Sequence, residues 1–143
     1  MYPKYEEDFY GWTMATAQLL KEGKLSETDM EHLIEELESL GGNQYDQLVN
    51  RLSVLITHLL KWQYQPALQG RSWKLTIKEQ RLKIKDVLVE NPSLKSKTKE
   101  ALLKAYKYAC YQAERETGLL MSTFPTLCPY SLGQFLDDAF YPE

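Results

Sequence analysis

Residues 44–64, QYDQLVNRLSVLITHLLKWQY, form the most hydrophobic stretch of the chain. From Leu48 to Leu60, leucine and isoleucine recur every three or four residues, which is the spacing of an amphipathic helix. Pro66 follows two residues after this stretch, and a proline cannot continue a helix. The stretch therefore predicts a central helix that ends near Tyr64.

Five further segments show a helical period or the residues that begin and end helices, and none alternates as a strand does. Glycines predict helix ends, and serines predict N-caps. The expected helices are residues 7–22 (ended by Gly23), 27–40 (Ser26 as N-cap, ended by Gly41-Gly42), 44–64, 73–90 (Ser72 as N-cap), 96–117 (ended by Gly118) and 132–138 (capping box of Ser131 and Gln134).

The length of the chain bounds the architecture. A chain of 143 residues buries about 69% of its unfolded surface, which suffices for one sizeable core. Seventeen aromatic residues and many leucines and isoleucines argue against disorder. We expect an all-α fold: a single-domain bundle spanning residues 1–143, with five main helices and a short C-terminal helix.

Composition also excludes several classes of protein. The longest apolar stretch, residues 52–60, is interrupted by polar residues and is too short to span a membrane. The first residues lack the basic and then apolar order of a secretory signal. Cys110 and Cys128 are the only cysteines, too few for a disulfide framework or a cysteine zinc site. We expect a cytoplasmic protein with reduced thiols and no membrane contact.

Charge is segregated along the chain. Residues 1–50 hold 3 basic and 11 acidic residues, whereas residues 51–118 hold 14 basic and 6 acidic ones. Two interpretations remain open: acidic and basic helices neutralise each other, or the basic middle binds nucleic acid. In residues 27–40 the acids lie opposite a predicted core-facing set of Met30, Leu33, Ile34, Leu37 and Leu40.

Several polar residues fall on apolar stripes. Arg81 lies within an apolar stripe of its helix, Asp29 and Glu36 share a face with leucines, and Arg51 and His58 share a face with Leu55. A buried charge needs a partner. We therefore expect a polar cluster of these five residues in which Arg81 or Arg51 pairs with Glu36 or Asp29. Such a cluster either fixes helix register or lines a pocket.

A metal site is not expected. Asp29 and His32 share a helical face with Glu36, but a di-iron bundle requires a second Glu-x-x-His pair. The only other histidine is His58, and Leu55 precedes it by three residues. We predict neither a metal nor another cofactor.

Arg51 and His58 suggest an alternative function. The segment RLSVLITH has the Arg-x4–6-His spacing of the HEPN ribonucleases, although Leu52 stands where those motifs usually have a polar residue. The resemblance implies metal-independent RNA cleavage, with the histidine as acid or base and the arginine stabilising the phosphorane.

A second alternative is nucleic-acid binding by residues 73–90. Lysines along this helix can contact phosphates, and aromatic residues near its start can stack on bases. The candidate contacts are Trp62, Tyr64, Trp73, Lys74 and Lys78.

Blocks of sequence along the whole chain resemble the domain of unknown function 29 family, small helical proteins common in cyanobacteria. The matching blocks are YEEDFYGW (5–12), LIEELESLG (33–41), HLLKWQYQP (58–66), SWKLTIKEQR (72–81), NPSL (91–94), ETGL (116–119) and FPTLCPY (124–130). The resemblance implies an almost entirely α-helical bacterial protein and no assigned activity. It places Asp8, Trp12, Glu36, His58, Trp62, Pro66, Trp73 and Arg81 in the shared pattern.

The leading expectation is a binding or protein-interaction module rather than an enzyme. Its partner is an unidentified protein, and the chain itself is a monomer or a homodimer.

Overall fold

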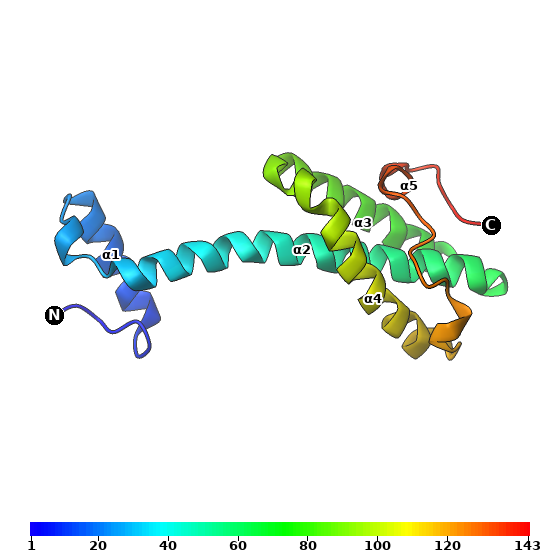
Figure 1. Cartoon of the computed structure of the whole chain (residues 1–143), viewed down its shortest axis with the longest axis horizontal. Helices are drawn as coiled ribbons and strands as arrows, with labels where there is room; N and C mark the ends of the chain where they lie inside the picture. Colours follow the sequence, from blue (N-terminus) through cyan, green and yellow to red (C-terminus); the bar gives the residue numbers. More distant parts are fainter. The chain divides into compact units, whose positions relative to one another are not determined.

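The computed structural model describes residues 1–143 and is all-α, without strands. None of its helices combines the length and the apolar character that crossing a membrane requires. Short 3-10 turns connect the helices (Figure 1). The α-helices are α1 (Phe9–Lys21), α2 (Met30–Tyr64), α3 (Arg71–Glu90), α4 (Thr98–Thr117) and α5 (Leu132–Leu136).

The helices expected at residues 27–40 and 44–64 are one continuous helix, α2, so the prediction that Gly41-Gly42 ends a helix is wrong. Neither glycine has the positive φ that a helix-ending glycine adopts. A glycine inside a helix costs about 1 kcal/mol relative to alanine. Ending α2 there would instead leave several backbone groups without partners and require a second nucleation.

Helix ends elsewhere match the sequence in part. Gly118 has a φ of +77° and ends α4, and Ser131 with Gln134 forms the predicted capping box of α5. Ser72 is not the N-cap of α3, because that helix begins at Arg71 and its N-cap is Gly70. The helix expected to begin at residue 96 begins at Thr98, because residues 96 and 97 belong to a 3-10 turn, Pro92–Lys97.

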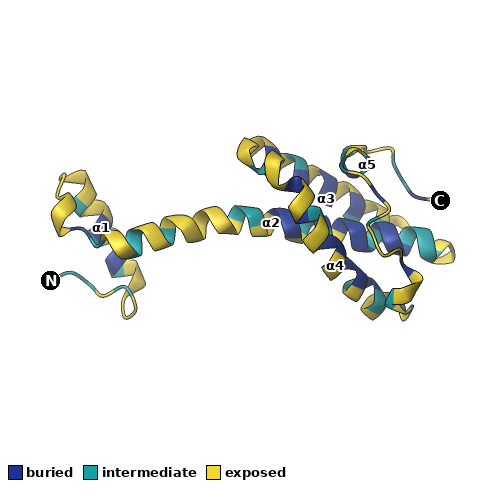
Figure 2. Ribbon diagram, viewed as in Figure 1, coloured by how far each residue is buried: buried dark blue, intermediate teal, exposed yellow.

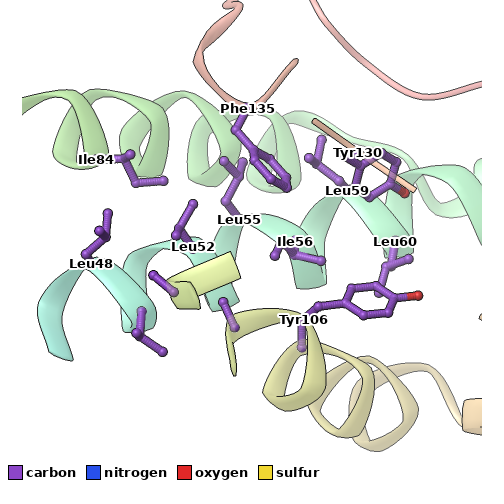
Figure 3. Packing of buried hydrophobic residues seen from close by; sticks show 14 of the residues in the cluster. Leu48, Leu52, Leu55, Ile56, Leu59, Leu60, Ile84, Tyr106, Tyr130 and Phe135 are labelled. Atoms are coloured by element: carbon purple, nitrogen blue, oxygen red, sulfur yellow. The ribbon is translucent and has the colours of Figure 1, made fainter. Parts of the chain in front are cut away.

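Residues 44–143 form a compact unit, the C-terminal unit, around the second half of α2. The side chains of Leu48, Leu52, Leu55 and Leu59 are fully buried and contact α3, α4 and the C-terminal segment in one hydrophobic cluster. Phe135 of α5 enters this cluster beside Leu55 (Figure 3). This core holds together the helices that carry the candidate residues Arg51, His58 and Arg81.

Residues 1–43 form a second compact unit, the N-terminal unit, made of α1 and the first half of α2. Trp12 is its only buried apolar side chain, at 2% exposure, and Thr16 and Thr28 are its other buried residues. A unit of about 40 residues usually needs a disulfide, a metal ion or a partner chain to fold stably. Figure 2 shows the corresponding change along α2, from exposed in its first half to buried in its second.

Candidate functional site

The five residues of the expected polar cluster lie in both units: Asp29 and Glu36 in the N-terminal unit, and Arg51, His58 and Arg81 in the C-terminal unit. The hydrogen-bond partners of Asp29, Glu36, His58 and Arg81 each lie in the same unit as the residue itself. The expected pairing of Arg81 or Arg51 with Glu36 or Asp29 stays a prediction.

Backbone carbonyls accept hydrogen bonds from two of the three guanidinium nitrogens of Arg81, which is fully buried, while its Nη1 has no hydrogen-bond partner. Its Nε donates to the carbonyl of Phe135 at 2.9 Å, and its Nη2 donates to those of Gln134 at 3.2 Å and Phe140 at 2.6 Å. The guanidinium also lies 5.4 Å from the ring centre of Tyr141. Carbonyls can replace a carboxylate because a charged donor forms strong hydrogen bonds with them. Arg81 thus fastens the C-terminal segment to α3.

Asp29 and Glu36 instead belong to a polar and aromatic network in the N-terminal unit. Asp29 accepts from the indole Nε1 of Trp12 at 3.0 Å and contacts Nδ1 of His32 at 2.7 Å. Glu36 accepts a hydrogen bond from the hydroxyl of Tyr5. This bond, burial and nearby acids raise the pKa of Tyr5 to about 12. The network holds α1 against the start of α2.

His32 lies at the centre of this network. Its ring stacks on Tyr5 with the centroids 4.2 Å apart, and its Nε2 lies 3.2 Å from Glu6. The hydrogen bond to Asp29 raises the pKa of His32 above 6.5 and outweighs desolvation. The same hydrogen bond lowers the pKa of Asp29. No three histidine, cysteine, aspartate or glutamate side chains in the chain lie close enough together to hold a metal ion.

His58 borders a cavity of about 320 Å³ between α2 and α4. Its Nδ1 lies 2.8 Å from the carbonyl of Val54, so a neutral ring carries its proton there and leaves Nε2 as an acceptor. Burial lowers the pKa of His58. Arg51 is not among the residues that line this cavity. A hydrogen bond from Lys83 lowers the pKa of Glu79 on α3, and the charge of Arg51 adds to this effect. RNA cleavage by this pair stays a prediction.

The aromatic residues proposed for base stacking contact other parts of the C-terminal unit. Trp62 lies 4.9 Å from Tyr141, and Tyr64 lies 5.3 Å from Phe124, measured between ring centres. Trp73 is half-buried, with its ring centre 4.7 Å from a lysine ammonium of α2. All three rings therefore have partners within the fold.

The lysines of α3 differ in their surroundings. Lys83 and Lys85 form ion pairs with acidic side chains at 2.6 and 3.0 Å. Lys74 lies 5.7 Å from the ring centre of Tyr141, and Lys78 is exposed. Nucleic-acid binding along α3 stays a prediction.

The feature that the sequence interpretation missed is an apolar strip on the first half of α2. Its members, predicted to face the core, are exposed: Met30 (43%), Ile34 (51%), Leu37 (60%) and Leu40 (58%). The period correctly marks one apolar helix face, but it does not say whether anything covers that face. A usable signal was the scarcity of other long apolar segments in residues 1–43.

Acidic side chains follow one edge of the apolar strip. Glu31, Glu35 and Glu38 each come directly after a strip residue, so they lie about 100° around the helix from it. All three are exposed. Residues 1–43 contain three lysines and ten acidic residues, a net charge of −7. The strip is thus an apolar surface in a negative field.

Comparison with known proteins identifies a family and nothing further. The model of a family described as "Domain of unknown function DUF29" matches residues 4–141. No curated protein matches the chain, and no solved structure does.

Replacing Arg81 by methionine tests its role in holding the C-terminal segment. The variant removes the donor of three backbone carbonyls, one in a buried and two in partly buried hydrogen bonds, so we expect the free energy of unfolding to fall by about 3 kcal/mol. Urea denaturation measures this change. Lys78→Met is the matched control, because Lys78 is exposed on the same helix and should change stability by less than about 0.5 kcal/mol. Equal stability of both variants would contradict the assignment.

The two histidines should titrate on opposite sides of 6.5. The pKa of His32 is raised, so its charged form stabilises the N-terminal unit below 6.5, and this stability is lost as pH rises through the raised value. The pKa of His58 is lowered by burial. Proton NMR of the imidazole C2 signals, assigned with His32→Gln, measures both. A His32 midpoint at or below 6.5 would refute the Asp29–His32 interaction.

Proposed function

Because the chain belongs to the DUF29 family, whose description assigns no activity, we propose its function from its own surface: it is a protein-interaction module that binds a partner through the apolar strip. The observation that carries this proposal is the contrast within the N-terminal unit. One apolar side chain of this unit is buried, while the four of the strip are 43–60% exposed. Contiguous exposed apolar surface on a folded protein is typical of interaction sites.

Partner binding would supply the burial that the N-terminal unit lacks. Fully burying a leucine or methionine side chain contributes about 1.5–3 kcal/mol. Each strip residue is already about half covered, so a partner gains about 1 kcal/mol from each. Four such residues in one row supply about 4 kcal/mol, so a stable complex also requires further contacts, such as ion pairs with the acidic edge.

The acidic edge favours a basic partner. Glu31, Glu35 and Glu38 would face the flank of whatever covers the strip. A second copy of the same surface would bring two acidic edges together, which is unfavourable. The strip residues are spaced by three or four positions, which suits a helix that presents leucines at the same spacing. The proposed partner therefore offers an amphipathic helix flanked by lysine or arginine.

Titration with two designed helices tests the proposal. Both have about three heptads with leucines at the a and d positions, and they differ in carrying lysine or glutamate at the flanking positions. We expect fluorescence anisotropy to show binding of the lysine peptide that weakens as salt is added. The glutamate peptide should bind at least about tenfold more weakly.

Variants separate the strip from other exposed apolar residues. Ile34→Ser with Leu37→Ser should weaken binding of the lysine peptide about tenfold or more. Leu75→Ser with Leu82→Ser, at exposed positions of α3, is the matched control and should leave binding unchanged. Equal affinity for the two peptides, or full binding by the strip variant, would contradict the proposal.

Other functions stay predictions beside this one. RNA cleavage by Arg51 and His58 and nucleic-acid binding along α3 are the alternatives. The proposed compartment is the cytoplasm, which is compatible with two free cysteines.

A further inference from the structure

A cavity in the C-terminal unit is lined by none of the residues of the proposed interaction surface. It has a volume of about 570 Å³, within the range of small-molecule sites. One wall is α4, with Leu102, Leu103 and Tyr106. The other wall is the segment after α4, with Phe124 and Leu127 among its lining residues. The cavity is a candidate site for an apolar ligand.

Contacts within the chain fix both walls. The hydroxyl of Tyr106 donates to the carbonyl of Pro125, which ties the following segment to α4. Phe124 is buried and meets the ring of Tyr64 edge to face. Gly118, with its positive φ, turns the chain back after α4. The cavity is therefore built into the fold rather than left between loose loops.

Lys107 is the only formally charged residue that lines the cavity. None of the ion pairs in the chain includes it. Cys110 and Cys128 also line the cavity, and burial raises the pKa of both thiols, so they are neutral at pH 7. The cavity thus combines an apolar lining with one positive charge that has no carboxylate partner.

We propose that this cavity binds a fatty carboxylate, with the apolar chain against α4 and the 121–128 segment and the carboxylate at the Lys107 ammonium. The apolar lining favours burial of hydrocarbon, and the unpaired ammonium selects an anionic end. A cationic amphiphile of the same length would place its charge against Lys107 and is disfavoured. This site is independent of the apolar strip.

Dodecanoate, dodecanol and dodecylammonium, each below its micelle concentration, are the probes. Isothermal titration calorimetry should show saturable binding of one dodecanoate per chain, about tenfold or more tighter than dodecylammonium. Dodecanoate should also slow the alkylation of Cys128 by N-ethylmaleimide, followed by mass spectrometry, because Cys128 lines the cavity.

Three variants assign the binding to this cavity. Lys107→Gln should weaken dodecanoate binding about tenfold and leave dodecanol binding unchanged. Lys99→Gln, at an exposed position of α4 outside the cavity, is the control and should bind as the wild type does. Leu103→Glu places a negative charge on the exposed lip and should abolish dodecanoate binding. Absence of saturable binding, no preference for the carboxylate, or unprotected Cys128 would overturn the proposal.

Discussion

Burial of the apolar side of α2 is the constraint on which the structure depends. From Leu48 onward, α3, α4 and the C-terminal segment cover that side and form one core. Before residue 44 the same helix carries a shorter apolar strip that stays exposed. One helix therefore supplies both the foundation of the C-terminal unit and the surface proposed to bind a partner. Hydrophobic burial is the dominant favourable term in folding and in most protein association. The same physical effect therefore underlies the core in the second half of α2 and the proposed binding by its first half.

Arg81 shows how a buried charge organises the chain around this core. Its donors reach carbonyls of Gln134, Phe135 and Phe140 and fix the C-terminal segment on α3. Phe135 is thereby held in the hydrophobic cluster. A buried guanidinium without acceptors would be strongly unfavourable, so the segment and the arginine depend on each other. Asp29 and Glu36 belong to a network in the N-terminal unit, whereas in the C-terminal unit Arg81 and His58 each bond to different backbone carbonyls.

The sequence predicted what local physics determines. Helical periods, the end of α4 at Gly118 and the capping box at Ser131 depend on neighbouring residues, and the structure has all of them. The prediction that Gly41-Gly42 ends a helix is wrong because continuous backbone hydrogen bonds outweigh the weak preference of glycine for a helix end. The partners of Arg81 lie more than 50 residues away and are backbone carbonyls, which no side-chain pattern reveals. The exposure of the strip likewise depends on whether another segment of the chain packs on it, which the period of the helix does not reveal.

Hydrogen exchange along α2 tests the central claim most directly, because both halves of the helix share one backbone and differ in burial. Amides of residues 48–62 should exchange only on global unfolding, whereas those of residues 31–43 should exchange at least about a hundredfold faster through local opening. Mass spectrometry of peptic fragments resolves the two stretches. Strong and uniform protection from residue 31 to residue 62 would show that the first half is as firmly held as the core, and would contradict the account.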